Sequence, residues 1–409
     1  MAESNRAART GRGRGLLGLV IAGALLAFGP VPAGGSPIYP MPDPDPFFLP
    51  PPDLAARAPG EVLAVRPMPP IAIFPDAAVV LVKFRSTNSA GEPIAATTTV
   101  LRPANARPDG PLLSYQHIIN GLGAKCAVSH VLYAPDPNLA LRESLLLNTI
   151  LARGWSVAMP DHLGPTFAYG AARLGGMITL DGIRAVQRVP ELQVAASPVA
   201  LLGYSGGGMA TMWAAAMQRS YAPELRPIGA AAGGVPMNLV KMVEGLGYQR
   251  HPAFGLALAA AIGLEREYPA ELPVSESMNA SGLAIRDRIA NSCTNDILLA
   301  GAGHNALDLA ASTSLINDPA ARKVVEDNSL ELYDGIPSTP VYEWHAPQDT
   351  LVPLDSIATT LTRYCAAGVP VRSELYDSPD HMTAEMLGAP AAIAWLEGRF
   401  RGEPAPSNC

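Results

Sequence analysis

Charged residues are scarce in this chain. Of its 409 residues, 16% are charged and 48% are hydrophobic. The formal net charge of -7 provides no basic footprint for nucleic acid. A mildly acidic surface also argues against strong electrostatic adhesion to anionic membranes. The chain can instead bury a sizeable core, in one large domain with an insertion or in two domains.

Metal and nucleotide motifs are also missing. The seven His residues are scattered, and neither an HExxH spacing nor a Walker loop nor a dinucleotide fingerprint occurs. We therefore expect no metal and no organic cofactor, and no nucleic-acid partner.

The apolar run Leu16 to Phe28 is too short for a comfortable membrane span, which needs about 20 residues. Four Arg residues precede this run, and small residues and Pro follow it. This order is typical of a cleavable secretory signal, which we place at residues 1–35, although an uncleaved anchor is the alternative. A twin-Arg signal is not supported, because no two Arg residues are adjacent. A lipidated N-terminus is not expected either, because no Cys closely follows the apolar run. We expect a secreted protein, or one associated with the cell envelope.

Cysteine is rare as well. The four residues are Cys126, Cys293, Cys365 and Cys409, and no two are close enough for CxxC redox chemistry or a zinc site. An even number in an exported chain suggests two disulfides. Three pairings are compatible with the sequence.

One stretch carries specific chemistry. Gly203-Tyr-Ser-Gly-Gly207 matches G-x-S-x-G and follows the short apolar run Val199 to Leu202, with a helical run from Gly208 onward. Strand, sharp turn and helix form the context of a nucleophile elbow, which exposes the hydroxyl of Ser205. The main-chain N–H of Gly206 would then stabilise an oxyanion. The alternative is a Gly-rich turn with an incidental Ser.

A serine nucleophile needs a base and an acid that orients the base. In elbow-type hydrolases the chain order is Ser, acid, His. Only His304, His345 and His381 follow Ser205. His381 lies after a predicted strand and before the last predicted helix, whereas His304 lies in a predicted cap and His345 precedes its candidate acid. We therefore select His381 as the base.

The predicted acid is Asp349, which follows the predicted strand Val341 to Trp344. Strand-end loops at the carboxyl side of a parallel sheet are where such groups converge. Asp377 and Asp380 are rivals, but near neighbours of His381 are poorly placed to orient its ring. An Asx turn is the alternative role for Asp349.

Strand and helix signals alternate along most of the chain, which predicts an α/β fold with a mostly parallel sheet wrapped by helices. An antiparallel hairpin is expected first, from the strands Asp76 to Ser86 and Ala95 to Leu101. The alternation stops between residues 237 and 308, where several helices are expected as an inserted cap. We assign the core to residues 76–236 and 309–409, and residues 36–75 to a Pro-rich extended segment packed on it.

The second oxyanion donor should come from the loop after an earlier strand. The best candidate is the loop that follows Ser114-Tyr-Gln116 and runs to Cys126. An ordinary polar loop is the alternative.

With these residues in place, the chain resembles the secretory lipase family of the α/β-hydrolase superfamily, typified by Candida antarctica lipase A. The resemblance runs from about Asp45 to Cys409. Its motifs, in order, are Asp45-Pro-Phe-Phe48 with Pro59-Gly60, Ser114-Tyr-Gln116, Arg153-Gly-Trp155, Pro160-Asp161 with Gly164-Pro165, Leu180-Asp-Gly-Ile-Arg-Ala185, Gly203-Tyr-Ser-Gly-Gly207, Ala232-Gly-Gly-Val-Pro236, Asp349 with Val352-Pro353, and Asp380-His381.

The resemblance implies the triad Ser205, Asp349 and His381, and a helical cap over the pocket. It also implies the disulfides Cys126–Cys293 and Cys365–Cys409. Two positions depart from the family pattern. Asn120 stands where the family has an Asp of the oxyanion hole, and Asn238 stands where an acid is expected. An amide donates a hydrogen bond at any pH, so we assign Asn120 to the oxyanion hole with Gly206.

The sequence thus predicts a secreted serine carboxylester hydrolase, a lipase or esterase that acts on acylglycerols or other lipid esters. The cap is expected to contact a lipid interface transiently. Two alternatives remain at this stage. One is an acyltransferase that uses the same triad, and the other is a non-catalytic surface protein on a hydrolase scaffold.

Overall fold

A computed structural model describes residues 35–136, 138–139 and 143–409 of the chain. The predicted signal peptide, apart from Gly35, lies outside these residues. Within them, nine strands form one sheet in the order β1-β2-β3-β5-β4-β6-β7-β8-β9. The strands are β1 Val62–Met68, β2 Ala77–Thr87, β3 Pro93–Pro103, β4 Leu112–Gln116, β5 Ser156–Pro160, β6 Val199–Tyr204, β7 Gly229–Gly233, β8 Val341–His345 and β9 Val371–Leu375.

The sheet has an antiparallel and a parallel part. β2 and β3 form the expected antiparallel hairpin, β1 pairs antiparallel with β2, and β3 pairs antiparallel with β5. From β5 to β9 all neighbours are parallel. The central strands β4 to β8 are buried along their whole length, as expected for parallel strands covered on both faces. The predicted α/β-hydrolase fold class is therefore confirmed.

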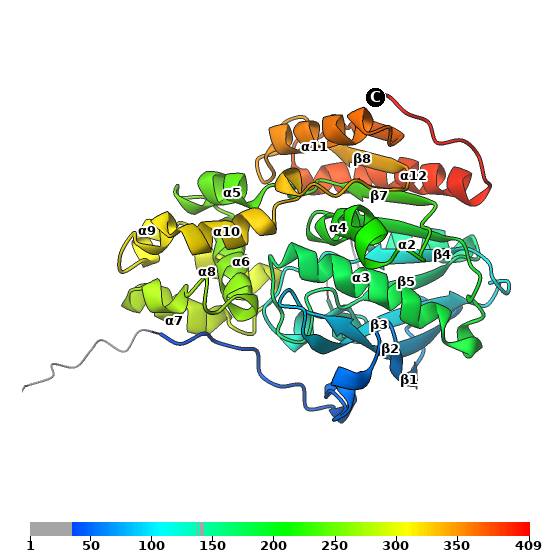
Figure 1. Cartoon of the computed structure of the whole chain (residues 1–409), viewed down its shortest axis with the longest axis horizontal. Helices are drawn as coiled ribbons and strands as arrows, with labels where there is room; N and C mark the ends of the chain where they lie inside the picture. Colours follow the sequence, from blue (N-terminus) through cyan, green and yellow to red (C-terminus); the bar gives the residue numbers. More distant parts are fainter. Residues whose placement is uncertain (1–34, 137, 140–142) are drawn as a thin grey trace, which may run out of the picture. The chain divides into compact units, whose positions relative to one another are not determined.

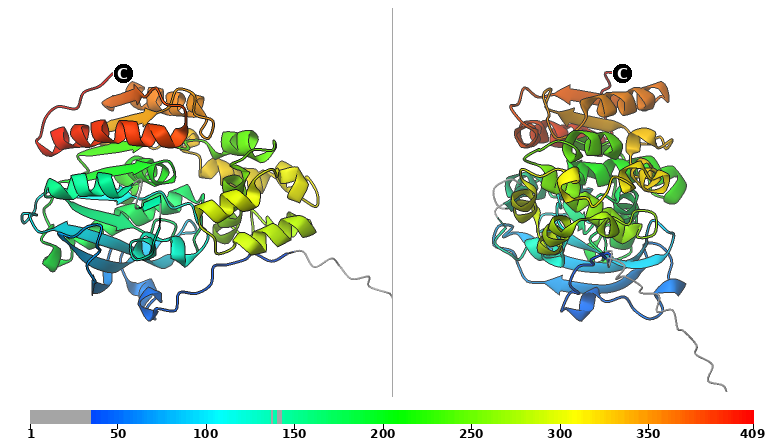
Figure 2. Two further views of the ribbon diagram at one scale, coloured as in Figure 1. Left: turned by 180° about the vertical axis from the view of Figure 1, so that it is seen from behind. Right: turned by 90° about the vertical axis from the view of Figure 1, so that its left-hand side faces the viewer.

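Helices cover both faces of the sheet. They are α1 Val128–Val131, α2 Ser144–Ala152, α3 Ala172–Gln187, α4 Gly206–Tyr221, α5 Leu239–Met242, α6 Phe254–Glu267, α7 Ala280–Ile289, α8 Thr294–Gly301, α9 Ala306–Leu309, α10 Pro319–Asp327, α11 Leu354–Ala366 and α12 His381–Phe400. Figure 1 shows α3 and α4 across one face. The reverse view in Figure 2 shows α12 on the other face.

Each face has its own apolar core. Ile183 of α3, Trp213 of α4 and Ile357 of α11 belong to one buried cluster. Leu147 of α2 and Trp395 of α12 belong to the other. Successive side chains of a strand point to opposite faces of the sheet, so the strands contribute residues to both clusters. This two-sided burial holds the carboxyl ends of the parallel strands at fixed positions.

The chain leaves the sheet between β7 and β8, and helices α5 to α10 lie in this interval. In Figure 1 they gather at one end of the sheet, at the left. A third apolar cluster, which includes Phe254, Leu258 and Ile262 of α6 and Ile297 of α8, holds part of this assembly together. These helices occupy the region of the predicted cap, and they continue past residue 308 to α10.

Two element predictions need correction. The spacing of Ile183 and Val186 predicts a helix from Thr179 to Val189, but the helix in the structure, α3, begins at Ala172 and ends at Gln187. Gly175 and Gly176 lie inside it because α4 packs so closely that a Cβ on Gly176 would lie 3.0 Å from Trp213. β1 lies within residues 36–75, the segment expected to be an extended lead-in. It contains Pro67, and β1 is an edge strand, where Pro is tolerated.

No helix in the described ranges is both long and apolar enough to cross a membrane.

Candidate active site

Ser205 lies between the end of β6 and the start of α4. Its backbone has φ 51° and ψ -120°, a conformation that L-residues rarely adopt. The strain is held by two main-chain hydrogen bonds: its N–H donates to Gly233 O at 2.8 Å, and its carbonyl accepts from Met209 N at 2.8 Å. The structure thus contains the strained strand-turn-helix that the motif predicts, with Ser205 only partly buried.

Two glycines of the motif are required by close contacts. A Cβ on Gly207 would lie 1.9 Å from the carbonyl oxygen of Gln116, at the end of β4. A Cβ on Gly203 would lie 2.5 Å from Thr211 Oγ1 and 2.6 Å from the backbone of Gly207. Because any side chain would force these elements apart, the turn can place Ser205 at its apex only with glycine at both positions.

His381 is the first residue of α12, and its side chain is almost fully buried. Its Nδ1 lies 2.5 Å from Oδ2 of Asp349, whose side chain is fully buried. Oδ1 of Asp349 accepts from the N–H groups of Leu351 and Val352, at 2.8 and 3.1 Å. Both oxygens of the carboxylate are therefore hydrogen-bonded, which holds its orientation.

The charge on Asp349 is stabilised in spite of its burial. Burial by itself raises the pKa of this carboxyl group. The hydrogen bond and charge of His381, with the N–H groups of Leu351 and Val352, outweigh burial and lower the pKa below its ordinary value. Asp349 therefore remains ionised at neutral pH, as a group that stabilises an imidazolium must.

The other imidazole nitrogen of His381 is free. Among the described residues no atom hydrogen-bonds to the buried Nε2. A buried polar atom without a partner is rare, and such an atom calls for an explanation. An imidazole that is oriented through Nδ1 and open at Nε2 is arranged to exchange a proton with a nearby group.

The rival residues lie elsewhere. Asp380 is exposed and caps α12, where it accepts from Thr383 N and Oγ1, both at 2.8 Å. Asp377 is exposed in the preceding loop. His345 at the end of β8 binds Glu343 through Nδ1, at 2.9 Å, and His304 lies between α8 and α9. None of these residues shares the Asp349–His381 contact.

A cavity of about 310 Å³ opens beside Ser205. The cavity is lined by Ser205, Gly206, Asn120 and Met209, and most of its remaining lining comes from the segment that contains α5 to α10 and is apolar. The α6 residues Leu256, Ala257, Ala260, Ala261 and Leu264 contribute one wall. An elongated apolar group could be held there, with its polar end at Ser205.

Asn120 follows β4 and lies beside the elbow. A Cβ built on Gly206 would come within 3.3 Å of Asn120 Oδ1, and the carbonyl of Asn120 accepts from Thr294 Oγ1 of α8 at 3.1 Å. Gly121 forms a β-bridge with Cys293. The loop that carries Asn120 is thus held against the start of α8, with the side-chain oxygen of Asn120 beside Gly206.

Asn238, the second departure from the family pattern, has a structural place. Its side chain caps α5 by accepting from Lys241 N at 3.0 Å, and its Nδ2 donates to Glu331 at 2.7 Å. Asn238 is buried and lies outside the residues that line the cavity.

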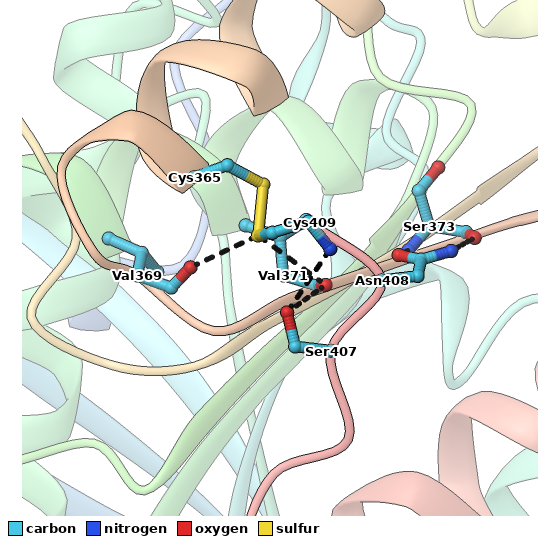
Figure 3. Close-up of a disulfide and its surroundings, with 7 residues drawn as sticks. All are labelled: Cys365, Val369, Val371, Ser373, Ser407, Asn408 and Cys409. Carbon is cyan, nitrogen blue, oxygen red and sulfur yellow. Dashed lines mark hydrogen bonds between the residues drawn. A yellow bond between two sulfur atoms is a disulfide. The ribbon is translucent and has the colours of Figure 1, made fainter.

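Two disulfides are present, Cys126–Cys293 and Cys365–Cys409, with sequence separations of 167 and 44. The first joins the loop after Asn120 to the start of α8. The second fastens the last residue of the chain to α11. Beside it, Asn408 bonds to β9 through Val371 and Ser373, so the tail covers the outer edge of the sheet (Figure 3).

In the part of the chain that the structure describes, no group of three or more His, Cys, Asp or Glu side chains could hold a metal ion.

Sequence reasoning did not identify two aromatic residues near the start of α12. Tyr204 precedes Ser205 and its hydroxyl donates to the carbonyl of His381, and Trp344 packs against Tyr204 with ring centroids 5.5 Å apart. Tyr204 is the variable position of the motif, so no pattern in the sequence could signal this role.

The sheet, the elbow and the helical insertion define a class of protein, the α/β-hydrolases. Among solved structures, Candida antarctica lipase A in its closed state superimposes with a TM-score of 0.83 at 29% identity, covering 90% of this chain and 89% of that chain. The rice cell wall degrading esterase LipA of Xanthomonas oryzae, at 17% identity and a TM-score of 0.66, shares the fold.

Sequence relatives narrow the class. The model of the secretory lipase family matches residues 139–408. A secreted triacylglycerol lipase of Malassezia restricta is 31% identical over 89% of this chain and 80% of its own length. A probable inactive lipase of Mycobacterium tuberculosis is also 31% identical, over 89% of this chain and 83% of its own. The chain therefore belongs to the secretory lipase family, as its resemblance implied.

Proposed function

We propose that this protein is a secreted serine carboxylester hydrolase that cleaves acylglycerols or other lipid esters. One observation carries the proposal. Ser205 lines an apolar cavity from a strained elbow after β6, and the segments after β8 and β9 hold a buried Asp349–His381 pair in which His381 Nε2 is free. This set of groups is the minimum that acyl transfer through a serine requires.

In the proposed mechanism, Ser205 Oγ attacks the ester carbonyl while His381 Nε2 accepts its proton. Asp349 holds Nδ1 and stabilises the imidazolium. The N–H of Gly206, at the start of α4, and the amide or backbone of Asn120 stabilise the oxyanion. His381 then protonates the departing alcohol. Water, activated by the same imidazole, releases the carboxylic acid from Ser205.

The cavity supports a lipid acyl group as the substrate. Burying apolar surface stabilises the complex by about 25 cal/mol per Å², so a long acyl chain gains binding energy along the cap-lined wall. Of the lining residues from Pro236 to Val325, most lie within residues 237–308. We propose that residues 237–308 act as a cap and that its outer surface contacts lipid transiently.

Secretion is part of the proposal. The family is a secretory one, the described cysteines are all paired in disulfides, and the N-terminus has the pattern of a signal peptide. We propose export to the extracellular space or the cell envelope, with residues 1–35 removed. No cofactor is needed for the proposed reaction.

The name of one relative, a probable inactive lipase, makes activity the first thing to test. The full secreted chain should be labelled by a fluorophosphonate probe and should hydrolyse p-nitrophenyl esters. Ser205→Ala should lose both properties, by on the order of a million-fold in rate, with unchanged circular dichroism. An unlabelled wild-type protein would favour a non-catalytic role. Preferential acyl transfer to an added alcohol would instead favour an acyltransferase.

A further inference from the structure

The first turn of α12 carries the buried His381 on its inner side. The second turn faces solvent at Met386 and Leu387, which are 60% and 48% exposed. The helix start is capped by Asp380, which is itself exposed. The orientation of the imidazole ring is set by Asp349, but this contact does not fix where the main chain of His381 lies relative to Ser205.

Two aromatic donors hold the inner side of the first turn of α12. The Tyr204 hydroxyl donates to the main-chain oxygen of His381, and Trp344 Nε1 donates to the main-chain oxygen of Ala384 at 3.2 Å. The Tyr204 ring also lies against the His381 ring, with centroids 5.0 Å apart. One side chain therefore contacts both the backbone and the ring of His381.

The contact is tight because glycines face it. Gly234 has φ +53°, and a Cβ there would lie 2.7 Å from His381 Cε1 and 2.7 Å from Tyr204 Cζ. A Cβ on Gly233 would lie 2.4 Å from the Trp344 ring. The Tyr204 ring thus lies between closely approaching backbone, Trp344 and His381, with little room to shift.

Tyr204 keeps its proton. Burial, and then the negative charges of Asp349 and of neighbouring carboxylates, raise the pKa of its phenol above the ordinary value. The hydroxyl is therefore a donor over the whole range in which an ester hydrolase works. The position of Tyr204 in the chain also matters, because a peptide bond joins it directly to Ser205.

We propose that Tyr204 is a positioning residue that fixes the main chain of His381 relative to Ser205. The inference rests on the proposed function of Ser205 and His381. Tyr204 directly precedes the nucleophile Ser205, and its phenol reaches the main chain of His381, the base. It therefore sets the separation of the two reacting groups. A misplacement of about 1 Å at such a site can cost roughly 100-fold in rate.

The test is Tyr204→Phe, which removes the hydroxyl and keeps the ring. We expect kcat and the rate of fluorophosphonate labelling of Ser205 to fall by about 10- to 100-fold, with KM unchanged. Tyr221→Phe is the matched control. Its hydroxyl donates to Asp181 at 2.7 Å and pairs with the Thr87 hydroxyl at 3.0 Å, and Tyr221 is not among the residues that line the cavity.

The outcomes separate the two proposals. Persistent activity of Ser205→Ala overturns the proposed function itself. An inactive Ser205→Ala with equal kcat and labelling rates in Tyr204→Phe, Tyr221→Phe and wild type overturns only the role of Tyr204. A rise in KM without loss of kcat also overturns it. If Tyr204→Phe does not fold, Trp344→Phe, which removes the donor to Ala384, should slow labelling of Ser205, and an unchanged rate counts against the proposal.

Discussion

Asp349 Oδ2 lies 2.5 Å from His381 Nδ1, although the two residues are 32 positions apart in the chain. Each comes from a segment that follows a parallel strand, Asp349 after β8 and His381 after β9. These two strands are neighbours in the sheet, so their carboxyl ends bring the carboxylate and the imidazole together. The contact is buried, whereas the closer neighbour Asp380 faces solvent.

This relationship predicts that Asp349→Asn lowers kcat by up to about 10⁴-fold, because an amide stabilises the wrong tautomer of His381. Asp380→Asn is the matched control. Asn caps helices about as well as Asp, so the control should retain activity and stability. Steady-state hydrolysis of a p-nitrophenyl ester checks both variants. An inactive Asp380→Asn together with an active Asp349→Asn would show that Asp349 is not the acid.

Asn120→Ala should lower kcat by roughly 10²- to 10³-fold with little change in KM, the usual cost of one lost oxyanion donor. The change removes an amide that lies beside Gly206 without touching the apolar walls of the cavity. Asn238→Ala is a control in the other departure from the family pattern, and it should affect stability rather than kcat. An unaltered kcat in Asn120→Ala would leave only the backbone of this loop as a donor.

Ala257→Phe should shift substrate preference toward shorter acyl chains. Ala257 lines the cavity on α6, and a phenyl ring there occupies space that a long chain needs. A pocket discriminates by roughly 10- to 200-fold per methylene group that fails to fit, so kcat/KM should fall at least about tenfold for long-chain esters and less for short ones. Leu299→Phe, at a position 72% exposed on α8, should leave the profile unchanged. Equal losses at all chain lengths would remove Ala257 from the acyl site.

Removal of either disulfide should lower the free energy of unfolding by about 2–4 kcal/mol, because each closes a long loop. The paired changes should differ in activity. Cys126 and Cys293 lie next to the loop that carries Asn120, so their replacement by Ser should also lower kcat. Replacement of Cys365 and Cys409 should leave kcat unchanged. Thermal unfolding and esterase assays on the two double variants test this difference, which equal kcat values would contradict.

Stability should decline above about pH 6.5 through His345. Burial lowers the pKa of this residue, but the hydrogen bond and charge of Glu343 outweigh burial and raise it above 6.5. A raised folded-state pKa contributes stability that is present below the unfolded value and is lost as pH rises through the folded value. His345→Gln should therefore cost most at acidic pH, by about 1–3 kcal/mol, and less at alkaline pH. Unfolding of wild type, His345→Gln and His304→Gln across this range checks the slope. A pH-independent difference would refute the linkage.

Much of the fold follows from local patterns. The elbow motif includes glycines at positions 203 and 207, and the buried parallel strands are mostly apolar, so both can be recognised from sequence. β1 escapes recognition because Pro67 interrupts its pattern, and only the free edge next to β2 makes a strand with Pro acceptable. The start of α3 escapes because the interior glycines that would normally end a helix are required by contact with α4.

The sequence by itself determined the family, the fold class, the nucleophile candidate and the order in which acid and base must follow it. These depend on short-range chemistry and on chain order, which one strand, one turn or one motif expresses. The sequence favoured Asp349 over Asp377 and Asp380, and the tertiary structure showed the contact of Asp349 with His381. The tertiary structure alone revealed that Tyr204 holds the main chain of His381. Such pairings depend on which strand ends are neighbours in the sheet, and that adjacency is not written in the local sequence of either partner.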